Sequence, residues 1–145
     1  MADGGWSDAQ EAAILDYYFR ATGTPAVASS YLALCLAPPA DNSDVISEPS
    51  YTGYARQQVL AAGWDAAVGG DPSYIDNSGG IQFPLCGEDV AEVVTHWALM
   101  SAASGGTLLF SGSITVPPGG LTLNSGVQPQ FDAGAVRVQL GSVAT

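Results

Sequence analysis

Hydrophobic and polar positions near the start of the chain follow a helical period. Apolar residues recur every three or four positions and form one face: Ala12, Leu15 and Phe19, with Ile14 and Tyr18 beside them. Ser7 is a typical N-cap residue, and Gln10 three positions later completes the pattern of a capping box. Gly23 is a typical helix stop. We therefore predict one amphipathic helix over about residues 8–21.

After this helix, apolar runs become short and are separated by Gly and Pro, which is typical of β-strands joined by turns. Alternation is clearest near the end, where Val136 and Val138 flank Arg137. The predicted strands cover residues 31–36, 54–60, 81–83, 93–100, 107–116, 121–123 and 135–140. In the fourth of these, both faces are largely apolar, which predicts a central or covered strand.

The segments between the strands carry turn signals. Ser104-Gly105-Gly106 and Pro117-Pro118-Gly119-Gly120 predict tight turns, whereas residues 37–50 form a long loop and residues 61–80 a second excursion. About seven strands at this spacing indicate a mainly β fold, an antiparallel β-sandwich or jelly roll with one N-terminal amphipathic helix.

The length of 145 residues suits one domain, 1–145, with the sandwich over about 30–141. Fourteen acidic residues face three arginines and no lysine, giving a net charge of -11. Nucleic-acid binding needs a basic surface, so we expect no nucleic-acid partner. Anionic membranes would repel the chain, no apolar run has the length of a membrane span, and the first residues lack a signal-peptide pattern. Charged residues make up only 12%, which favours a surface partly covered by partner subunits.

Few residues have the chemistry of a catalytic or metal site. His96, the only histidine, lies in an apolar strand, so we interpret it as a residue of a sheet face or interface, with a hydrolase as the distant alternative. Cys35 and Cys86 lie in apolar runs typical of buried thiols, and a disulfide between them is left open. Asp41-Asn42-Ser43-Asp44 could supply calcium ligands, although turn bonds to the backbone are the preferred interpretation. We expect no catalytic residue, cofactor or metal site, and hence no enzyme.

Tryptophan positions and the fourth strand give the candidate contacts with other subunits. Trp97 is expected in the core, whereas Trp64 is either a core residue or an exposed anchor for a partner or a sugar. The candidate interface residues are Trp64, Val94, His96 and Met100.

The order of several segments carries a resemblance. After the helix come Tyr31-Leu32-Ala33-Leu34-Cys35-Leu36-Ala37-Pro38-Pro39, Ile46-Ser47-Glu48-Pro49, Tyr54-Ala55-Arg56, Asn77-Ser78-Gly79-Gly80-Ile81-Gln82-Phe83-Pro84, Val94-Thr95-His96-Trp97-Ala98-Leu99 and Ala102-Ala103-Ser104-Gly105-Gly106-Thr107-Leu108-Leu109-Phe110-Ser111-Gly112. From about residue 8 to 140, the chain resembles small virion proteins of tailed bacteriophages, often labelled tail fibre proteins and in some particles similar to trimeric head-decoration (cement) proteins. It departs from their pattern at residues 61–75.

The resemblance implies a β-sandwich subunit that adheres to other virion proteins after assembly in the bacterial cytoplasm. Because the chain has no coiled-coil heptads or collagen-like repeats, we slightly prefer a head-decoration homotrimer bound to the major capsid protein. The alternative is a tail fibre or tail adaptor component, or a receptor-binding module that recognises carbohydrate through exposed aromatics such as Trp64 and Tyr74.

Overall fold

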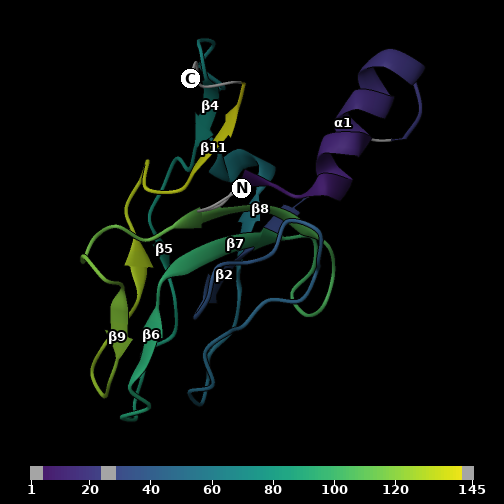
Figure 1. Ribbon diagram of the computed structural model, residues 1–145. Helices are drawn as coiled ribbons and strands as arrows, with labels where there is room; N and C mark the ends of the chain where they lie inside the picture. Colours follow the sequence, from purple (N-terminus) through teal and green to yellow (C-terminus); the bar gives the residue numbers. More distant parts are fainter. Residues whose placement is uncertain (1–4, 24–28, 142–145) are drawn as a thin grey trace.

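The computed structural model describes residues 5–23 and 29–141, in which the strands form one larger sheet and three small ones (Figure 1). The larger sheet is antiparallel throughout, with the strand order β1-β8-β7-β2-β3. Its members are β1 (Gly5–Trp6), β2 (Ser29–Cys35), β3 (Gln57–Leu60), β7 (His96–Met100) and β8 (Leu108–Ser113). A turn of 3-10 helix, Ala61–Gly63, follows β3.

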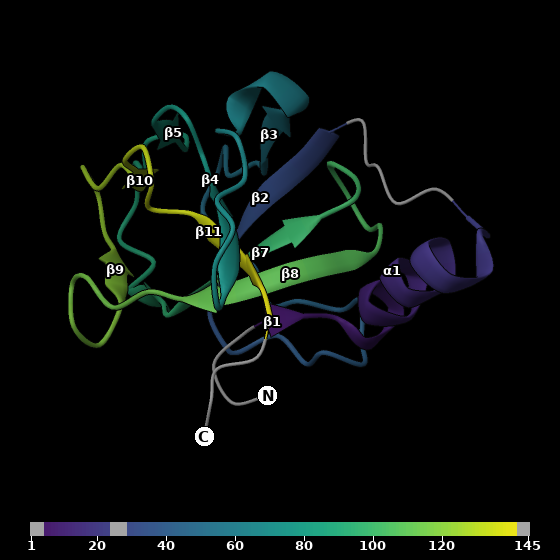
Figure 2. The same ribbon diagram turned by 90° about the horizontal axis from the view of Figure 1, so that it is seen from above.

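Each small sheet is an antiparallel pair of short strands. The pairs are β5 (Ile81–Gln82) with β10 (Gln130–Phe131), β4 (Ser73–Asp76) with β11 (Arg137–Leu140), and β6 (Glu92–Val94) with β9 (Leu121–Leu123). Seen from above, β5, β10 and β9 lie on the side of the larger sheet away from α1, and β4 and β11 are drawn across its middle (Figure 2). A mainly β, antiparallel fold with one N-terminal helix is therefore confirmed. The β-sandwich or jelly-roll arrangement stays a prediction, with which one larger sheet and three small pairs are compatible.

The two faces of the larger sheet bury side chains of different size. Large residues such as Leu34, Trp97 and Phe110 join the main core, to which the small sheets contribute residues including Phe83 and Val136. The opposite face buries a smaller cluster that comprises Ala33, Cys35, Ala98, Met100 and Leu108. Ile46, from the loop after β2, packs against this cluster. Because side chains alternate along each strand, one face of the larger sheet packs in the main core and the other face packs against the loop after β2.

Several predicted strands need correction. The strand predicted over residues 93–100 is two strands, β6 and β7, separated at Thr95. β6 pairs with β9, whereas the N–H of Thr95 already donates to Cys35 O of the larger sheet (3.0 Å). The strand predicted over 54–60 begins at Gln57. The excursion at 61–80 contains β4, which pairs with the C-terminal strand β11 in a long-range contact that local pattern does not reveal.

The helix α1 (Asp8–Arg20) begins as predicted, with Ser7 Oγ accepting from the N–H of Gln10 at 3.3 Å. The second half of the capping box does not form, because the Ser7 N–H donates to Leu109 O instead (3.1 Å). The helix ends at Ala21, in the left-handed region at φ 53°, two residues before Gly23. No residue of α1 is buried, and both ribbon views show it projecting from the sheets (Figures 1 and 2).

Candidate interaction surface

The base of α1 is fixed to the larger sheet at an irregularity in β8. The register of β7 and β8 shifts between Leu99 and Met100, which leaves Leu109 without a partner residue across the ladder. Such a bulge frees backbone groups for other contacts. Ser7 uses two of them, since its Oγ donates to Leu108 O (2.6 Å) and its N–H to Leu109 O (3.1 Å). The helix therefore starts from a defined point on the sheet.

The loop after β2 secures the other side of this junction. The N–H of Asp8 donates to Asp41 O (2.9 Å), and Asp44 Oδ1 accepts from the N–H of Leu108 (2.9 Å). Ser43 Oγ accepts from the amide two residues later, a local turn bond of the predicted kind. Within residues 5–23 and 29–141, no group of three or more His, Cys, Asp or Glu side chains is placed to hold a metal ion. The loop thus contacts the first residue of the helix through the Asp41 carbonyl and contacts β8 through the Asp44 carboxylate.

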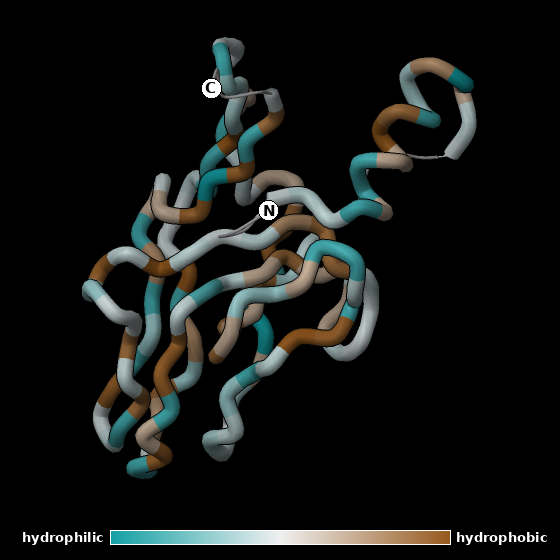
Figure 3. Tube along the Cα trace, in the orientation of Figure 1, coloured by the Kyte–Doolittle hydropathy of each residue, from teal (hydrophilic) through white to brown (hydrophobic). Residues whose placement is uncertain are grey.

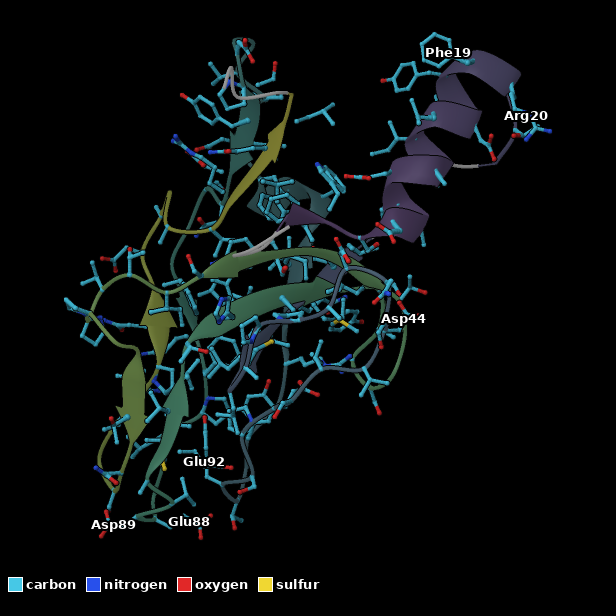
Figure 4. All side chains as sticks on the ribbon, in the orientation of Figure 1. Phe19, Arg20, Asp44, Glu88, Asp89 and Glu92 are labelled. Carbon is cyan, nitrogen blue, oxygen red and sulfur yellow. The ribbon has the colours of Figure 1, made fainter. Side chains whose placement is uncertain are left out.

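The outer part of α1 presents apolar side chains to solvent. Leu15, Tyr18 and Phe19 are 58%, 72% and 83% exposed, and we call these three residues the helix face. Hydrophobic segments recur along α1 in Figure 3, and Figure 4 places Phe19 and Arg20 at its outer end. Arg20 pairs with Asp16 at 3.1 Å on the exposed surface, where such a pair contributes little. An apolar stripe on a helix normally packs on a core, whereas the described residues leave the helix face largely exposed.

An apolar groove lies beside the base of the helix. One pocket of about 200 Å³ is lined by residues that include Trp6, Ser30, Trp64, Ile75 and Val138. A second pocket of about 300 Å³ shares Trp6 and extends between α1 and Leu140. Trp6 is held in place because its Nε1–H donates to Gln139 O at 2.7 Å. We call these two pockets together the groove.

Three of the four predicted interface residues are buried within the chain itself. Met100 is 0% exposed and His96 is 7% exposed, because β7 is a central strand and Ile46 packs on the cluster that contains Met100. Val94, the last residue of β6, is 0% exposed in the main core. This corrects the expectation that their side chains present a neutral surface to a neighbour. Trp64 is partly buried and lines the groove, so it remains a candidate contact.

The candidate catalytic groups are buried within the fold. His96 Nδ1 is 2.9 Å from Thr95 Oγ1, and the groove is lined by other residues. Cys35 and Cys86 are free thiols with no exposed surface. Burial, and to a smaller extent the charge of Glu48, raises the pKa of Cys35 to about 12, so its thiol stays protonated at neutral pH. Neither thiol is placed to act as a nucleophile.

The acidic cluster near residue 90 holds neighbouring loops together. Its carboxylates accept hydrogen bonds from backbone N–H groups: Glu92 from Ser50, Glu88 from Thr52 and Asp89 from Ser125. The bonds from Thr52 hold the pKa of Glu88 below its usual value, because they favour the ionised carboxylate. Figure 4 shows this cluster at the end of the molecule away from α1.

A buried ion pair joins two of the segments that carry the family resemblance. Arg56, whose side chain is 6% exposed, donates from Nε to Glu48 Oε1 at 2.9 Å. Its Nη1 donates to Ala102 O and Gly105 O in the turn before β8, both at 2.8 Å. Tyr54 also donates to Glu48 Oε1, and burial raises its pKa. These polar residues therefore support loops of the fold.

The match to a known family covers nearly all of this architecture. The family described as "Podophage GP4 fiber I protein gp80" matches residues 5–139, from β1 through α1 and the small sheets into β11. The chain belongs to this family. None of the curated proteins compared with the chain matches it.

Membership of the fibre I family confirms the predicted resemblance to virion proteins of tailed bacteriophages and makes the chain a virion structural protein. In the part of the chain that the structure describes, no helix combines the length and apolarity needed to span a bilayer. Sequence reasoning missed the groove, because Trp6 and Trp64 lie far apart along the chain and only the fold brings them to one pocket. The one local signal was a tryptophan directly before the N-cap Ser7.

Proposed function

We propose that this protein is a fibre component of a podophage-type particle that works by adhesion to other virion proteins and carries no catalytic centre. The family match over residues 5–139 is the observation that supports this proposal most strongly. It favours the tail fibre alternative over the head-decoration role that the sequence alone had favoured.

The chemistry of the chain supports a role in adhesion. The residues with catalytic or ligand chemistry are engaged in the fold: His96 is buried, both thiols are buried, and Glu88 and Asp89 hold loops. The surface instead offers the helix face and the groove. Contacts of this kind become strong when a symmetric particle repeats them, because each additional contact is intramolecular. We include a homotrimeric state in the proposal.

A receptor-binding role remains the second candidate because Trp6 and Trp64 line one pocket. Tyr74 is not among the residues that line this pocket, and the Arg137 guanidinium stacks over one face of its ring at 3.8 Å. A glycan array with purified protein tests this candidate: binding that is lost in Trp64→Ala supports it, and no binding at any glycan removes it.

Particle microscopy tests the proposed location. Virions carrying a small epitope tag on this protein are labelled with antibody and imaged. Label confined to the tail region is expected. Label spread over the head would overturn the fibre assignment and favour decoration of the major capsid protein.

A further inference from the structure

We propose that α1 of one copy docks into the groove of a second copy, with Tyr18 and Phe19 as its anchors. This inference rests on the proposed function. It specifies how one copy adheres to another, which a multi-copy fibre component needs. The partner is therefore another molecule of this same chain.

The helix cannot place its outer end in its own groove. Its first turn is held by bonds from Ser7 to Leu108 and Leu109 and from Asp8 to Asp41. A helix of 13 residues is about 20 Å long, so anchors at its base carry the outer end away from the sheet. Figure 4 shows Phe19 and Arg20 far from the strands that form the groove. A groove of suitable chemistry is then within reach only on another copy.

The groove matches the helix face in chemistry as well as in apolarity. Trp6 and Trp64 offer aromatic walls to the pocket of about 200 Å³. Ser30, only 4% exposed, lines the same pocket, and its Oγ has no hydrogen-bond partner among the described residues. A buried hydroxyl without a partner is costly, and the phenol of Tyr18 is an apolar ring that ends in a donor and acceptor. Insertion of Tyr18 would fill the pocket and would also give the Ser30 hydroxyl a hydrogen-bond partner.

Charge favours this contact between two acidic molecules. Copies that each carry a net charge of -11 repel one another, so a stable contact must use surfaces with few acids. The helix face has no charged residue, and neither has the pocket between Trp6 and Trp64, whereas the second pocket of the groove has one acid, Glu11, on its lining. Arg20 follows the helix face directly, and the exposed Asp65 follows Trp64. Arg20, which pairs with Asp16 on its own helix, and Asp65 thus lie next to the two apolar surfaces that we propose to meet.

The available area is sufficient for a stable assembly. A buried aromatic side chain covers roughly 150–250 Å², so Tyr18, Phe19 and Leu15 together offer roughly 400 Å² and the groove a similar area. In a reciprocal dimer both helices and both grooves meet, so each copy buries roughly 800 Å², the share of each partner in a standard specific interface. In a ring of three copies each pairwise contact buries roughly 400 Å² per copy, and the assembly depends on all of its contacts being made together.

Light scattering and sedimentation on the purified full chain test the contact. The wild type is expected to be an oligomer at micromolar concentration. The double variant Tyr18→Ser/Phe19→Ser should weaken association by at least about tenfold, as loss of central aromatic anchors does. The matched control is Val45→Ser/Val116→Ser, which also removes two highly exposed apolar side chains (82% and 83%) but outside the proposed contact. A monomeric wild type, or a helix variant that associates as strongly as the control, overturns the proposal.

Cross-linking between two populations tests the partner directly. Arg20→Cys protein is mixed with Asp65→Cys protein under mild copper-phenanthroline oxidation, while the native thiols are buried and do not compete. A disulfide between the two populations is expected. Mixing Arg20→Cys with Val116→Cys is the control, and equal cross-linking there would contradict the docking geometry. Because these assays use purified protein, they can fail while particle imaging still places the protein in a fibre, and the reverse also holds.

Discussion

Asn77 offers the sharpest test of how the small sheets are held together. Its side chain is 1% exposed and makes three hydrogen bonds. Nδ2 donates to Gly79 O (2.7 Å) and Asp132 O (3.0 Å), while Oδ1 accepts from the N–H of Val136 (2.9 Å). One amide therefore ties the segment after β4 to the segment between β10 and β11.

We expect Asn77→Ala to destabilise the protein by about 3–4 kcal/mol. The change removes three bonds worth about 1 kcal/mol each and leaves the buried N–H of Val136 without its acceptor, which adds to the cost. For a chain of this size, that corresponds to a fall in melting temperature of roughly 10 °C. Thermal and urea unfolding followed by circular dichroism measure both quantities.

The neighbouring Ser78 provides the control for this experiment. Its hydroxyl donates to Ala62 O at 3.4 Å on the exposed surface, so Ser78→Ala should stay within about 0.5 kcal/mol of wild type. Asn77→Asp should also destabilise at neutral pH, because it keeps the acceptor for Val136 but turns a negative oxygen toward two carbonyls. An Asn77→Ala protein within about 1 kcal/mol of wild type would refute this account of the hydrogen bonds.

Three further changes test separate features. Gly112→Ala should prevent correct packing or lower the melting temperature severely, because a Cβ there would lie 2.3 Å from the Trp97 ring; a variant that melts like wild type contradicts this close approach. Both thiols, Cys35 included, should resist Ellman's reagent until the protein is unfolded, and rapid labelling of the native state would show that the sheet is open. Arg137 holds the pKa of Asp76 below its usual 3.8, so the pair stabilises the fold above that value and loses its effect as pH falls through the lower folded-state pKa. Asp76→Asn should therefore lower the melting temperature more at about pH 6 than at about pH 2, and a constant difference would argue against the linkage.

Local signals in the sequence predicted both ends of α1 to within about one residue, although the residue that ends the helix is Ala21 and not Gly23. Ser7 is a cap whose geometry involves residues within one turn, so sequence was sufficient there. Ala21 adopts the left-handed conformation although it is not a glycine, so its residue type gives no sequence signal for the end of the helix. The amphipathic pattern indicated an apolar face, but pattern alone cannot say whether such a face packs on its own domain or stays exposed.

Long-range pairing limited the prediction of the strands and of the surface. The alternation through residues 93–100 continues across Thr95, although the chain passes there from one sheet to another. β4 was missed because its partner β11 lies about 60 residues away along the chain. Met100 was assigned to an interface because both faces of its strand are apolar and a neighbouring subunit was one possible cover, whereas Ile46 from a loop of the same chain packs there. These outcomes depend on which segments meet, and residue pattern does not specify that.

The attachment of the helix to β8 has a consequence for when copies can meet during synthesis. Ser7 finds its acceptor at Leu108, 101 positions later, and Trp6 is fixed by Gln139, 133 positions later. Since a nascent chain leaves the ribosome from its N-terminus, α1 emerges long before the walls of the groove exist. We expect a chain in synthesis to expose its docking helix while offering no place for another helix to bind. Copies would then associate only after each molecule has formed the contacts of Trp6 with Gln139 and of Ser7 with Leu108.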